Sequence, residues 1–103
     1  MEFGLTPAHR SIISAIFAKY PQIKTVLVYG SRAKGTYRPG SDIDMTIAEG
    51  DHLDLNLLLK LTDDFDQSQL PFFVDISILS QLTEPALIDH IHRVGQVIYQ
   101  REA

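Results

Sequence analysis

The sequence predicts a single α/β (α+β) domain built on a mixed β-sheet. The chain has 103 residues, and that length suits one domain with one modest core. Segments with apolar residues at helical spacing alternate with short runs rich in β-branched and aromatic residues. Their order along the chain is helix, strand, strand, helix, strand, helix, and this order favours a mixed sheet over residues 1–103.

The first third of the chain predicts a helix, a strand and a loop. Thr6 and Pro7 read as an N-cap followed by proline at the first helical position, and apolar residues then recur at helical spacing until Lys19. The run 25–29 is β-branched and aromatic, so it predicts a strand. Residues 30–41 hold three glycines, a proline and several basic side chains, which predicts a loop that begins with at most one helical turn.

The remaining elements follow from the same patterns. Residues 42–48 alternate polar and apolar side chains, so they predict a strand with one apolar face. The leucine-rich segment 53–65 predicts a helix, and the apolar run 72–79 predicts a third strand. Residues 84–93 predict a last helix. The segment 97–99 fits either a short closing strand or a frayed helix end.

Composition excludes several classes of protein. There is no cysteine, so neither a disulfide framework nor a thiolate metal site can form. No apolar stretch approaches the ~20 residues of a membrane span, and the first residues do not resemble a signal peptide, so a cytoplasmic protein is expected. The net charge of −4 disfavours a long nucleic-acid template, because phosphate contacts demand a basic excess. The four histidines are scattered and are expected on the surface.

Two neighbouring features carry the chemistry. Asp42 and Asp44 are two residues apart on a predicted strand, so their carboxylates leave the same face. Such a pair of like charges is costly without a cation, and Mg²⁺ is commonly held by one or two carboxylates together with substrate phosphates. Just before them, Gly30 and Ser31 form a turn whose exposed amides can cradle phosphate.

Further residues extend this pattern. Arg32 and Lys34 follow the glycine-serine turn and add positive charge for a triphosphate. Asp75 is the one acid in the third apolar strand. If that strand lies beside the strand of Asp42 and Asp44, three carboxylates converge, which suits two metal ions that clamp the attacking and leaving oxygens of a phosphoryl displacement.

At this point the sequence resembles a known family. Tyr29, then Gly30-Ser31, ten residues, and Asp42-Ile43-Asp44-Met45 are similar to the signature of the polymerase-β-type nucleotidyltransferase superfamily. The length of the chain matches its branch of minimal nucleotidyltransferases, and the likeness runs from about Val26 to Leu79. It implies a mixed sheet with helices on one face and a single minimal nucleotidyltransferase domain.

The resemblance also implies roles for the residues. Asp42 and Asp44 would bind two Mg²⁺ ions, and Asp75 would complete the catalytic metal and help to deprotonate the acceptor hydroxyl. Gly30 and Ser31 would hold the triphosphate of ATP. Arg32 and Lys34 lie outside the strict signature, so their nucleotide-binding role rests on charge alone.

The acceptor is a separate question. The chain has no room for the acceptor domains of larger nucleotidyltransferases. Minimal members are often antitoxins paired with a helical HEPN-type toxin, and the resemblance implies a hetero-oligomer in which AMP is transferred from ATP to a tyrosine of that toxin. Two alternatives stay open. The protein could neutralise its partner by binding alone, or it could modify a small molecule such as an aminoglycoside.

Overall fold

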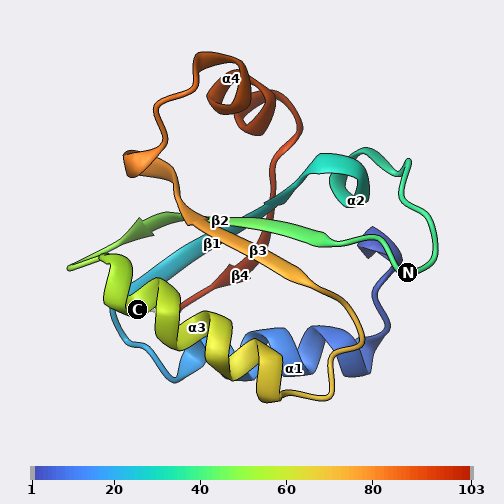
Figure 1. The fold of residues 1–103 in the computed structure, drawn as a ribbon, viewed down its shortest axis with the longest axis horizontal. Coiled ribbons are helices and arrows are strands. Elements are labelled where there is room, and N and C mark those ends of the chain that lie inside the picture. The colour runs from blue at the N-terminus through green and yellow to red at the C-terminus, as the bar shows by residue number, and fades with distance from the viewer. Residues whose placement is uncertain (1, 103) are drawn as a thin grey trace.

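The computed structural model describes residues 2–102, which form a four-stranded sheet with helices on both sides of it (Figure 1). The strands are β1 (Ile23–Tyr29), β2 (Ile43–Gly50), β3 (Val74–Ile78) and β4 (Gln96–Gln100). The α-helices are α1 (Pro7–Ala18), α2 (Gly30–Lys34), α3 (Leu55–Gln67) and α4 (Pro85–Val94), and two short 3-10 helices span Glu2–Gly4 and Leu79–Gln81.

The sheet is mixed, as predicted. Its strand order is β3-β2-β1-β4. β1 pairs antiparallel with both β2 and β4, whereas β2 and β3 are parallel because α3 carries the chain back between them. The C-terminal segment, which fitted either a short strand or a frayed helix end, is a strand. Residues 96–100 lie at the sheet edge and pair with β1.

Two layers make the core. The helices α1 and α3 cover one face of the sheet, while α2 and α4 lie on the other side of the strands (Figure 1), so the expectation of helices on one face holds only for α1 and α3. The apolar side chains of β2 are sealed beneath the long helices, and Ile43, Met45 and Ile47 are all 0–1% exposed. The period-two alternation of β2 therefore turns its apolar residues to the core, and the side chains between them point to the opposite face of the sheet.

The helix ends have local causes. Thr6 and His9 form a reciprocal capping box at the start of α1, each backbone N–H donating to the other side chain at 3.1 Å. Asp54 caps α3 by accepting from the Leu57 N–H at 2.9 Å, so this helix begins at Leu55, two residues after the predicted start. The predicted helical turn after β1 is present as α2.

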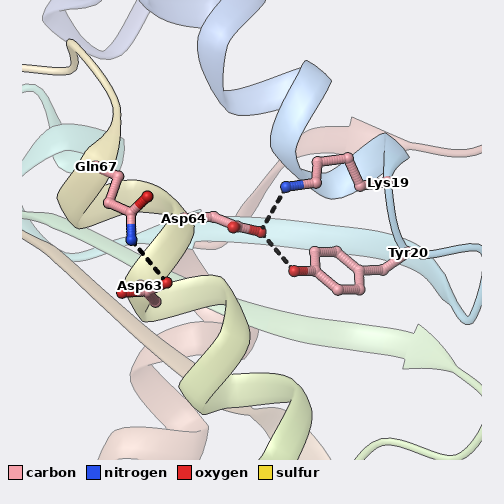
Figure 2. Close-up of polar contacts among 5 residues, drawn as sticks. All are labelled: Lys19, Tyr20, Asp63, Asp64 and Gln67. Atoms are coloured by element: carbon pink, nitrogen blue, oxygen red, sulfur yellow. Dashed lines mark hydrogen bonds and ion pairs between the residues drawn. The ribbon is translucent and has the colours of Figure 1, made fainter.

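A polar cluster ties the end of α1 to α3 (Figure 2). The Tyr20 hydroxyl donates to Asp64 at 2.5 Å, and the Lys19 ammonium lies 3.1 Å from the same carboxylate. The pKa of Tyr20 is raised to about 12, chiefly by the hydrogen bond to Asp64 and, to a smaller extent, by burial. The same bond holds the pKa of Asp64 below its ordinary value. The cluster therefore stabilises the helical layer under the sheet.

None of the helices within residues 2–102 has both the length and the apolar character to cross a membrane.

Tyr20→Phe should lower the free energy of unfolding at neutral pH by about 1 kcal/mol, because one hydrogen bond to a charged carboxylate is lost. The folded-state pKa of Tyr20 is raised from 10.0 to about 12, so its contribution is complete below pH 10 and disappears as the pH rises through about 12. Urea denaturation of both proteins across this range measures the difference. Tyr99→Phe, which removes a hydroxyl outside the cluster, is the control, and equal stabilities of wild type and Tyr20→Phe would refute the assignment.

Candidate active site

The glycine-serine turn lies directly against the acidic strand. β1 ends at Tyr29, which is the register partner of Asp44 on β2, and α2 begins at the next residue, Gly30. Gly30 has a φ of +71°, a conformation that favours glycine. A Cβ at this position would collide with the Asp44 carboxylate. Backbone conformation and close approach both require glycine here, and together they bring the turn onto the acid.

The carboxylates come from two adjacent strands. Asp44 and Asp75 are register partners in the parallel β2–β3 pair. Two residues further along, the Ser77 hydroxyl donates to the Thr46 hydroxyl at 2.9 Å, so the polar face continues beyond the acids. Asp42 lies one residue before β2 begins. The structure thus places the three predicted acids at the same end of neighbouring strands.

These acids influence one another. Burial raises the pKa of Asp44, and the charges of Asp75 and then Asp42 raise it further. Asp44 is half-buried, whereas Asp42 and Asp75 are exposed. Within residues 2–102 the acidic and histidine side chains do not already gather into a group of three or more that could hold a metal ion. The hard oxygen donors and the mutual repulsion nevertheless fit Mg²⁺, which takes carboxylate ligands and would neutralise the repulsion.

Ser31 and Lys34 belong to the same short helix. Ser31 follows Gly30 in the first turn of α2 and is half-buried. Lys34 is the last residue of α2 and is exposed. Gly35, with a φ of +81°, ends the helix in the left-handed conformation. Both residues lie on the short helix that follows Gly30, and their role as nucleotide ligands stays a prediction.

Arg32 takes a different place from the one expected of a phosphate ligand. Its side chain is turned into the protein and only 3% exposed. The guanidinium donates to the Ser41 carbonyl from Nε at 3.1 Å and from Nη2 at 2.6 Å, and to the Phe3 carbonyl from Nη1 at 2.8 Å. This geometry favours anchoring of the backbone over contact with a triphosphate.

His90 belongs to the site, although the sequence pattern predicted a surface histidine. It lies on α4, half-buried, and its Nε2 accepts the Gly30 N–H at 3.1 Å. Its ring meets the Tyr29 ring edge to face at 6.1 Å. The accepting nitrogen must be unprotonated, so the proton of the neutral ring is on Nδ1. No local pattern could reveal this contact, because the two partners are 60 residues apart.

Gly30→Ala should destabilise the protein by more than ~1 kcal/mol, because alanine is strained at this φ and its methyl group meets Asp44. Gly35→Ala is a matched control, since it has a similar φ and its Cβ would meet nothing within 4 Å among the described residues. Urea denaturation of the two variants separates the strain from the collision. Equal losses of stability would show that the contact with Asp44 is unimportant.

Asp44→Asn should leave the thermal midpoint at neutral pH equal or higher. Because the folded-state pKa of Asp44 is raised, the stability that this group contributes is lost as the pH rises through that pKa, and the neutral amide avoids the loss. Asp64→Asn should do the opposite, because the pKa of Asp64 is lowered in the folded state. Thermal denaturation at neutral pH compares them, and a marked fall for Asp44→Asn would make Asp44 a structural residue.

The chain is similar in sequence to known proteins. The family model described as polymerase beta, nucleotidyltransferase, matches residues 12–103. The chain is 30% identical over 92 residues to the probable protein adenylyltransferase MntA of Haemophilus influenzae, and the match covers 89% of this chain and 80% of MntA.

Two solved structures are similar in fold. One is a chain of a toxin–antitoxin complex with AMP-PNP, with a TM-score of 0.71 and 22% identity over 90% of this chain and 74% of that one. The other belongs to the complex of a tri-AMPylated Shewanella oneidensis HEPN toxin with MNT antitoxin, with a TM-score of 0.65 and 19% identity over 91% and 71% of the two chains. Because the family model matches residues 12–103, which are most of this chain, the chain belongs to the polymerase β nucleotidyltransferase family and is a homologue of MntA.

Proposed function

We propose that this nucleotidyltransferase transfers AMP from ATP to a tyrosine hydroxyl of a HEPN-type toxin and thereby acts as its antitoxin. The observation that carries the proposal is the pairing of Asp44 with Asp75 across β2 and β3, directly beside the Gly30 turn. Relatives support the choice of acceptor. MntA is a probable protein adenylyltransferase, and a similar fold occurs in complexes that contain AMP-PNP or a tri-AMPylated HEPN toxin.

Each residue has a role in this reaction. The backbone amides of the turn and the Ser31 hydroxyl would hold the triphosphate, with Lys34 as an additional cation at the end of α2. Asp42, Asp44 and Asp75 would hold Mg²⁺. When bound, Mg²⁺ neutralises the phosphate charge and the charge that develops on pyrophosphate. The acceptor oxygen attacks the α-phosphorus, and the bond from that phosphorus to pyrophosphate breaks.

The exposure of Asp75 suits a macromolecular acceptor. Its strand, β3, is an edge strand of the sheet, and the Asp75 carboxylate is exposed. A hydroxyl on a partner protein can therefore approach Asp75 from the open side and pass its proton to this carboxylate. Asp44, half-buried between Tyr29 and Asp75 in the register of the sheet, cannot be reached as easily. The protein's contribution is to position the reactants and stabilise the developing charge.

Incubation of the HEPN-type partner with this protein, Mg²⁺ and ATP should add the mass of one or more AMP groups to the partner. Mass spectrometry of the intact partner and of its peptides measures the gain and locates it on tyrosine. Asp44→Asn should abolish the gain, because a metal ligand is lost. Asp63→Asn, which changes an exposed acid of α3, is the matched control and should transfer at the wild-type rate.

Other outcomes would contradict the proposal. A tight complex without any mass gain, with each nucleoside triphosphate tested in turn, would mean that the protein neutralises its partner by binding alone. A gain on an aminoglycoside and none on the partner would assign a small-molecule acceptor. A gain that survives Asp44→Asn would place the chemistry elsewhere in the molecule.

A further inference from the structure

Arg32 is a buried cation held by backbone carbonyls. Among residues 2–102 its guanidinium makes no ion pair, although the side chain is only 3% exposed. Removing a charge from water costs several kcal/mol unless hydrogen bonds compensate it. Here the carbonyl oxygens of Phe3 and Ser41 supply those bonds. Because the cation needs these oxygens, it constrains the backbone that carries them.

The strongest constraint falls on Ser41. Its carbonyl oxygen accepts from both Nε and Nη2 of Arg32, at 3.1 and 2.6 Å. Ser41 also closes a tight turn with Arg38: its N–H donates to the Arg38 carbonyl at 3.0 Å, and its hydroxyl accepts the Arg38 N–H at 2.8 Å. The residue that follows is Asp42. The two hydrogen bonds from Arg32 thus fix the backbone at Ser41, the residue that precedes Asp42.

Asp42 needs such an anchor more than Asp44 does. Asp44 lies inside β2, where pairing with both neighbouring strands fixes its position. Asp42 precedes the strand, and the pairing ends with the hydrogen bond from the Ile43 N–H to the Phe73 carbonyl at 2.9 Å. The ladder alone therefore does not determine how Asp42 lies relative to the glycine-serine turn.

The same guanidinium also contacts the segment that enters β3. It lies over the Phe72 ring, 4.4 Å from the ring centroid, and over the Tyr37 ring at 5.4 Å. Phe72 immediately precedes the residue whose carbonyl pairs with Ile43. One side chain thereby joins four segments: α2, which carries it, the N-terminal segment at Phe3, the residue before Asp42, and the approach to the strand of Asp75.

We propose that Arg32 is a positioning residue for nucleotidyl transfer, which holds Asp42 against the Gly30–Ser31 turn through the Ser41 carbonyl. The inference rests on the proposed function for its kinetic consequence, but the anchoring itself does not depend on the identity of the acceptor. It replaces the direct phosphate contact that the sequence suggested for Arg32.

Arg32→Lys tests the proposal, because lysine keeps the charge but cannot place two N–H groups on Ser41 while reaching Phe3. We expect kcat for transfer to fall by about 10–100-fold, as for a displaced catalytic group, with the KM for ATP nearly unchanged. Binding of Mn²⁺ alone, followed by electron paramagnetic resonance, should weaken by about tenfold. This second readout needs neither ATP nor an acceptor.

Arg101→Lys is the matched control. Arg101 also donates to backbone carbonyls, to Ala18 at 2.9 Å and to Ile23 at 3.4 Å, and these lie at the other end of β1 from the site. Its replacement should lower the thermal midpoint and leave kcat and Mn²⁺ affinity unchanged. Ser41→Ala is a second variant that disturbs the same turn without opening the core, and it should weaken Mn²⁺ binding in the same direction by a smaller factor.

The outcomes separate the explanations. A rise in the KM for ATP with kcat unchanged would make Arg32 a phosphate ligand and overturn the proposal. A fall in the thermal midpoint alone, with Mn²⁺ affinity unchanged in both Arg32→Lys and Ser41→Ala, would make the contact purely structural and also overturn it. If the wild-type protein transfers no AMP while both variants still lose Mn²⁺ affinity, the positioning role stands and the proposed function fails.

Discussion

The close approach of Gly30 to the Asp44 carboxylate is the contact around which the site is built. Antiparallel pairing of β1 with β2 sets Tyr29 opposite Asp44, so the backbone of the next residue, Gly30, passes close to the Asp44 carboxylate. A Cβ at residue 30 would collide with the Asp44 carboxylate, and the φ of +71°, a conformation that favours glycine, leads the chain directly into α2. The strand register, the glycine and the helix start therefore depend on one another, and a change in any of them would move the backbone amides at the start of α2.

One face of the sheet carries the apolar core, and the other carries the three acids of the candidate site. On one face, α1 and α3 seal the apolar side chains of β2, and the Tyr20–Asp64 bond fastens the helices to each other. On the other face, three acids lie close enough that the pKa of Asp44 is raised by burial and by its neighbours. Such repulsion opposes folding, so the covered face must provide the free energy that keeps the acids together.

Long-range contacts then fix what the strands leave undetermined. His90 reaches the Gly30 N–H from α4, and Arg32 reaches Ser41 and Phe3 from α2. The contact between Gly30 and His90 spans 60 residues, whereas Arg32 is 29 residues from Phe3 and nine from Ser41. The edge strand β3 has no further strand beside it among the described residues, and Asp75 on this strand is exposed.

The sequence alone determined the elements, the mixed sheet, and the acids and glycine that the strands bring together, because periodicity and motif spacing are local properties. It did not determine the burial of Arg32, the contact of His90 or the pairing of residues 96–100 with β1. An arginine side chain ordinarily stays in water, and Arg32 is buried only because backbone carbonyls accept its hydrogen bonds. Its destination depends on which carbonyls the folded chain brings within reach, and only the tertiary structure decides that.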